Sequence, residues 1–170
     1  LILVASCKDA NPDTPKTDDK PVKIVRVITP QFNQDSAYQY IQNQVDFGPR
    51  VPNSKGHLAC ASWLNSKLQS FGAETIIQKG EVTAFNGDKL NIQNIIGQFS
   101  PEKTQRILLF SHWDTRPVAD KDIKDADKPI DGANDGGSGV GVLLEIARQF
   151  SLKEPNYGVD IIFFDAEDYG

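Results

Sequence analysis

The sequence predicts an α/β fold whose sheet is mixed, mostly parallel and flanked by helices. Two stretches, RILLFSH (106–112) and VDIIFFD (159–165), are nearly continuous apolar runs. Strands of this kind are buried on both faces, as in sheets that helices cover on both sides. The segment GSGVGVLLEIARQF (137–150) lies between them, follows a glycine-rich turn and has the length of a helix. A strand, a helix and a second strand in this order indicate a parallel pair of strands.

Two helices are predicted before the sheet. The first covers residues 35–48, with Asp35 or Ser36 as its N-terminal cap. The second begins at residue 53 or 54 and ends at Gly72. Its apolar positions are spaced three and four apart: Leu58, Ala61, Leu64, Leu68 and Phe71. Cys60 lies among them and is interpreted as a small buried apolar side chain.

A hairpin follows the second helix. The stretches TIIQKGEVTAF (75–85) and KLNIQNIIGQF (89–99) have the half-polar pattern of strands. Asn86 and Gly87 stand between them, and this dipeptide favours a tight hairpin turn. Because a hairpin joins antiparallel strands, the predicted sheet is mixed.

Composition excludes several classes of function. The 170 residues are 39% hydrophobic and 24% charged, as in a soluble globular protein. A formal net charge of −5 offers no basic field for nucleic acid. The longest apolar run falls well short of the roughly 20 residues that a membrane-spanning helix needs.

The N-terminal residues resemble an export signal. The chain begins LILVASC, and the pattern V-A-S-C after an apolar run is similar to a bacterial lipobox, in which the cysteine carries the lipid. We therefore expect residues 1–7 to be a signal-peptide remnant and Cys7 to be the lipidation site. Residues 8–22 are rich in proline and mixed charge and predict a flexible tether. The expected location is the bacterial cell envelope, lipid-anchored or periplasmic.

Residues 23–170 are predicted to be the N-terminal part of one catalytic domain. The last strand runs directly into three acids, Asp165, Glu167 and Asp168, two residues before the sequence ends. A buried strand needs further elements to cover it. We therefore expect the domain to be truncated on its C-terminal side.

Three stretches of this sequence place metal-binding side chains at the carboxyl ends of strands, where ligands gather in open α/β sheets. His112 and Asp114 end one strand, Asp135 lies in the glycine-rich turn, and Glu167 with Asp168 ends another strand. Each stretch alone has an ordinary structural explanation. Together, an imidazole and several carboxylates suit a divalent metal of the zinc type.

The motifs SHWDTRPVAD, GANDGGSGVGVLLEIAR and DIIFFDAEDYG resemble the zinc aminopeptidase superfamily that also contains the glutaminyl cyclases. The resemblance runs from about Phe47 to Gly170 and includes FGPRVPNSKGHLACASWLNSKL. The residues of these motifs are most similar to those of the bacterial members of the animal-type glutaminyl-peptide cyclotransferases. The implied fold is that of the zinc exopeptidases.

The resemblance implies a role for each site residue. Asp135 and Asp168 would be zinc ligands, although relatives often have Glu at the second position. Glu167 would be the general acid and base. His112 would bind a metal only where a second ion is present, with Asp114 orienting its ring. A further His ligand would lie beyond residue 170, so this stretch alone is expected to be inactive.

Three functions remain open from the sequence. The first is zinc-dependent cyclisation of an N-terminal glutamine to pyroglutamate with release of ammonia, which would use one zinc ion. The second is a zinc aminopeptidase with two ions. The third is a catalytically silent, envelope-anchored binding domain. The expected partners are the N-termini of peptides or proteins and, through the lipid anchor alone, a membrane; no nucleic acid is expected.

Overall fold

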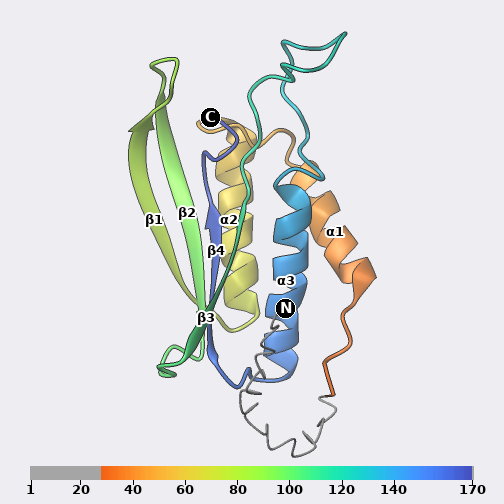
Figure 1. Cartoon of the computed structure of the whole chain (residues 1–170), viewed down its shortest axis with the longest axis vertical. Coiled ribbons are helices and arrows are strands. Elements are labelled where there is room, and N and C mark those ends of the chain that lie inside the picture. Colours follow the sequence, from red (N-terminus) through yellow and green to blue (C-terminus); the bar gives the residue numbers. More distant parts are fainter. Residues whose placement is uncertain (1–27, 170) are drawn as a thin grey trace, which may run out of the picture.

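The computed structural model describes residues 28–169, which form a sheet with helices packed beside it (Figure 1). The elements in chain order are α1 (Gln34–Val45), α2 (Lys55–Ser70), β1 (Glu74–Thr83), β2 (Lys89–Phe99), β3 (Arg106–His112), α3 (Gly137–Leu152) and β4 (Gly158–Phe164). The predictions for the signal-peptide remnant, Cys7 and the tether lie outside the described residues. Within these residues, no helix is long and apolar enough to cross a membrane.

The sheet has the strand order β1-β2-β4-β3. Strands β3 and β4 pair in parallel, from Arg106 opposite Gly158 to His112 opposite Phe164, and α3 connects them. The other two described pairings, β1 with β2 and β2 with β4, are antiparallel. The predicted mixed α/β class and the hairpin are therefore confirmed. Mostly parallel pairing was expected, but among the described strands only β3 and β4 pair in parallel. The hairpin joins the sheet through β2, which pairs antiparallel with β4.

Helices α2 and α3 cover one face of the sheet, and α1 packs on the outside of α3 (Figure 1). Alternate residues of β4, Val159, Ile161 and Phe163, point to this face and are buried. Leu64 and Leu68 of α2 meet them in the same core. Burial of these apolar side chains is the main force that holds the two parallel strands in place.

The opposite face of the sheet is not covered by the described residues. Leu108, Phe110 and Phe164 are exposed there, and the rings of Phe110 and Phe164 pack edge to face with their centroids 5.7 Å apart. The sequence predicted burial on both faces for these strands. Within residues 28–169 that prediction holds for the helix-covered face alone.

The helix starts depend on side chains that accept a hydrogen bond from a free backbone amide. The cap of α1 is Asn33, which accepts from Ser36, and not Asp35 or Ser36 as the sequence suggested. Ser54 caps α2 as predicted and accepts from the amide of His57. Cys60 is buried as expected, but Leu58 of the same helix is 55% exposed.

Candidate metal centre

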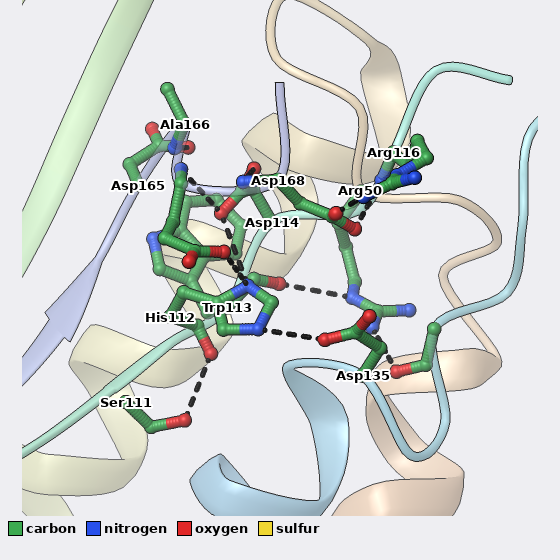
Figure 2. Close-up of polar contacts among 12 residues, drawn as sticks. Arg50, Ser111, His112, Trp113, Asp114, Arg116, Asp135, Asp165, Ala166 and Asp168 are labelled. Carbon is green, nitrogen blue, oxygen red and sulfur yellow. Dashed lines mark hydrogen bonds and ion pairs between the residues drawn. The ribbon is translucent and has the colours of Figure 1, made fainter. Parts of the chain in front are cut away.

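Three chain segments meet at the edge of the sheet where β3 and β4 end. The two strands are parallel, so their carboxyl ends lie together, and α3 begins beside them (Figure 2). His112 is the last residue of β3, and Asp135 lies in the turn before α3. Nε2 of His112 is 3.0 Å from Oδ1 of Asp135. The structure therefore brings together residues that are 23 positions apart, as the sequence predicted.

The imidazole of His112 faces carboxylates from three directions. Its Nδ1 lies 3.5 Å from Oδ1 of Asp114 and 3.7 Å from Oε2 of Glu167. The Asp114 carboxylate, and then the negative charges of Glu167 and Asp135, raise the pKa of His112 to about 9, whereas burial acts in the opposite direction. Neighbouring negative charge therefore favours the protonated form of this imidazole.

Asp114 is fully buried, and its carboxylate also fixes the turn after β4. Its two oxygens accept hydrogen bonds from the backbone amides of Glu167, at 3.2 Å, and Asp168, at 3.1 Å. The sequence had assigned Asp114 only to the orientation of the His112 ring. Asp114 can face the His112 ring and accept from these two amides at the same time. It therefore connects the end of β3 to the acids that follow β4.

Ala166 holds this turn in a conformation that residues with a side chain rarely adopt. Its φ is 62°, in the left-handed region. Oδ1 of Asp165 accepts a hydrogen bond from the Ala166 amide at 2.9 Å, and the amide of Asp165 donates to Asn94 on β2. Strained backbone of this kind persists where surrounding contacts determine it and is common at functional sites. Here it turns Glu167 and Asp168 away from the direction of the strand.

Glu167 and Asp168 lie in opposite environments although they are adjacent in sequence. The side chain of Glu167 is 66% exposed, whereas that of Asp168 is 4% exposed. The two oxygens of Asp168 accept hydrogen bonds from Arg116, one from its backbone amide at 2.8 Å and one from Nε at 3.1 Å. Glu167 is thus open to solvent, and Asp168 is held in one orientation.

A second polar pair, His57 with Asp165, is fully buried beneath the site. Nε2 of His57 lies 2.8 Å from Oδ2 of Asp165, and the His57 ring stacks on Trp113 with centroids 4.5 Å apart. Asp165 also accepts from the backbone amide of Gln93 at 2.6 Å. Sequence reasoning missed this pair, since its members are 108 residues apart. The signal available was a histidine on a helix whose other inward residues are apolar.

Comparison with known proteins supports the resemblance of these motifs to the zinc aminopeptidase superfamily. Residues 94–170 match the model of Peptidase family M28. The solved glutaminyl cyclase of Tannerella forsythia is 59% identical to this chain, with a TM-score of 0.81, and the match covers 83% of this chain and 49% of that one. The glutaminyl cyclase of Bacteroides thetaiotaomicron bound to N-acetylhistamine is 57% identical, with the same coverage and TM-score.

Residues 94–170, which contain all the candidate metal ligands, thus resemble peptidase family M28. A leucine aminopeptidase precursor from Bacteroides thetaiotaomicron is also similar, at 56% identity and a TM-score of 0.83, and the match covers 85% of this chain and 51% of that one. The chain spans about half the length of the solved structures that it matches. The predicted zinc exopeptidase-like fold is confirmed.

The donor atoms at this sheet edge suit zinc, which binds imidazole nitrogen and carboxylate oxygen. Asp168 accepts one hydrogen bond on each oxygen and keeps further lone pairs, because a carboxylate offers about four acceptor sites. Asp135 is largely exposed, and among the described side chains it forms a hydrogen bond with His112 alone. Within residues 28–169, no three or more His, Cys, Asp or Glu side chains are arranged to hold a metal ion.

Proposed function

We propose that the full-length protein is a glutaminyl-peptide cyclotransferase that depends on zinc. The observation that carries this proposal is the placement of Glu167, an exposed carboxylate beside His112 at the sheet edge that also carries Asp135 and Asp168. The identity of 57–59% to two solved glutaminyl cyclases supports the choice of reaction. The substrates would be peptides or proteins with an unblocked N-terminal glutamine.

Asp135 and Asp168 would hold the zinc ion, with a further ligand from outside the described residues. When bound, zinc would supply a Lewis acid that polarises the γ-carbonyl of the substrate glutamine. Arg116 and Asp114 would keep Asp168 in one orientation through the contacts described above. Residues that support ligands in this way commonly affect metal affinity.

Glu167 would move the proton that the reaction requires. The α-amine of the substrate forms a bond to the γ-carbonyl carbon, and the bond from that carbon to the amide nitrogen breaks. Glu167 would accept a proton from the α-amine and donate it to the departing nitrogen, which leaves as ammonia. No oxidant, reductant or water molecule is consumed, and the product is a pyroglutamyl peptide.

An aminopeptidase is the second candidate. His112 and Asp135 are in contact, and His112 could serve as a ligand of a second metal. The 56% identity to a leucine aminopeptidase precursor supports this alternative. Glu167 would then activate a water molecule for attack on the first peptide bond. The number of zinc ions, one for a cyclase and two for an aminopeptidase, separates the two candidates.

The deciding experiment is incubation of the zinc-loaded full-length protein with a peptide that begins with glutamine, followed by mass spectrometry. We expect loss of one ammonia above the rate without enzyme. The control is the same peptide with an acetylated N-terminus, which lacks the free amine and cannot cyclise. Loss of a whole N-terminal residue would replace the cyclase with the aminopeptidase. No change in any peptide would favour the silent binding domain.

We also propose that Cys7 anchors the protein to a bacterial membrane through a lipid. The support is the pattern V-A-S-C after an apolar run and the proline-rich tether that follows. We expect Cys7→Ala to move the protein from the membrane fraction to the soluble fraction. Cys60→Ala is the matched control, because Cys60 is buried in α2 and should not affect fractionation. Unchanged fractionation of Cys7→Ala would contradict the anchor.

A further inference from the structure

Arg50 lies in the turn between α1 and α2, and its side chain is fully buried. Its guanidinium donates hydrogen bonds to three backbone carbonyls, those of Trp113 (3.2 Å), Gly132 (2.8 Å) and Asp131. The carbonyl of Arg50 in turn accepts from the amide of Thr115 at 3.3 Å. One residue of this turn therefore holds both the segment after β3 and the loop before α3 (Figure 2).

The charge of Arg50 is buried without a hydrogen bond to a carboxylate among the described residues. Burial lowers its pKa, and the neighbouring Cys60, Asp131 and Asp114 act in the opposite direction. A buried charge costs folding free energy, and here the hydrogen bonds to the three carbonyls offset that cost. The role of Arg50 therefore depends on the segments that these carbonyls belong to.

The loop that Arg50 holds is closed tightly around its guanidinium. Gly132 has a φ of 57°, and a Cβ built on it would overlap the methyl group of Thr115 and lie 2.9 Å from Nη2 of Arg50. The carbonyl of Gly132 also accepts from the amide of Gly137 at 3.1 Å, where α3 begins. Residues 132–137 thus form a closed turn, and Asp135 lies within it.

We propose that Arg50 is a positioning residue that fixes the loop carrying Asp135 beside the end of β3, so that the Asp135 carboxylate is placed for cation binding. The Trp113 carbonyl fixes the residue next to His112, and the Asp131 and Gly132 carbonyls fix the loop that carries Asp135. The result is the 3.0 Å contact between the two side chains. This inference rests on the zinc site proposed above, and the experiment separates the two.

Lysine cannot reproduce these contacts. Arginine presents its donors in a rigid planar fork, whereas lysine has a single ammonium group on a flexible stem. Arg50→Lys therefore keeps the positive charge but loses the simultaneous hold on three carbonyls. Arg50→Gln is a second variant, which keeps an N–H donor and removes the charge.

The test is zinc affinity of the full-length protein, measured by competition with a chromophoric chelator at a temperature where each variant is folded. We expect Arg50→Lys and Arg50→Gln to weaken zinc binding by about 10–100-fold, the range seen when residues that support metal ligands are changed. Restoration of turnover by excess zinc would accompany this loss. A purely structural role would lower the melting temperature and leave zinc affinity unchanged.

Arg106→Lys is the matched control. Arg106 also bonds backbone carbonyls, those of Ser100 and Lys103, but at the opposite end of β3. Its replacement should affect stability without affecting zinc binding. Wild-type zinc affinity in a folded Arg50 variant would overturn the proposal. Failure of both Arg50 variants to fold would also overturn it, because Arg50 would then be a requirement of the fold. Absence of zinc binding in the unmodified protein would instead overturn the proposed function.

Discussion

Glu167→Gln is expected to lower the turnover number of the full-length protein by about 10²–10⁴-fold, the usual contribution of a general acid–base group. Zinc content should stay the same, because Glu167 is not among the proposed ligands. The fold should also be preserved. The side chain is 66% exposed, and the backbone amide that donates to Asp114 is unaffected by the substitution.

The measurement is steady-state kinetics on a peptide with N-terminal glutamine, together with zinc analysis of the purified variant. Glu154→Gln is the control, because Glu154 is 70% exposed and pairs with Lys103 away from the site. It should have wild-type kinetics. A near-normal rate in Glu167→Gln would remove Glu167 from the proposed proton transfer, and loss of zinc from that variant would indicate that it is a ligand instead.

The parts of the fold that depend on local pattern could be predicted from the sequence. The two apolar strands, the helix between them and the hairpin at Asn86 and Gly87 are all present. The convergence of His112 and Asp135 also followed from local information, because parallel strands place their carboxyl ends at one edge. The types of these residues and the order of the strands and helices were sufficient to predict that the two side chains converge.

What the sequence did not show depends on contacts between distant segments. Arg50 binds carbonyls 63 to 82 residues away, and His57 pairs with Asp165 at a separation of 108. Backbone carbonyls have no signature in a sequence, so the partners of Arg50 could not be inferred. The exposed position of Leu58 has a similar cause, because which face of α2 is buried depends on where the sheet lies.

The electrostatics of the site weaken one argument for a metal ion. Several acids at one sheet edge repel one another, and a bound cation would compensate that repulsion. In the structure, Arg116, buried Arg50 and His112 already supply positive charge close to them. The case for zinc therefore depends on the donor atoms and on the family, and no longer on uncompensated charge.

Asp168→Asn is expected to have the largest effect on zinc binding. Replacement of supporting residues typically weakens metal binding by about 10–100-fold, so loss of a direct ligand should exceed about 100-fold. The amide that replaces the carboxylate is neutral and presents only one oxygen to a metal. That oxygen can still accept a hydrogen bond from the backbone amide of Arg116, so the turn should remain folded.

Asp120→Asn provides a control that involves the same arginine. Asp120 accepts a hydrogen bond from Nη1 of Arg116 at 2.9 Å and is more than half exposed. If loss of a partner of Arg116 were the cause of weaker zinc binding, both substitutions would show it. Chelator competition on the two variants separates these explanations. Full zinc occupancy in Asp168→Asn would exclude Asp168 as a ligand, and the cation would then have to be held by Asp135 with ligands from outside the described residues.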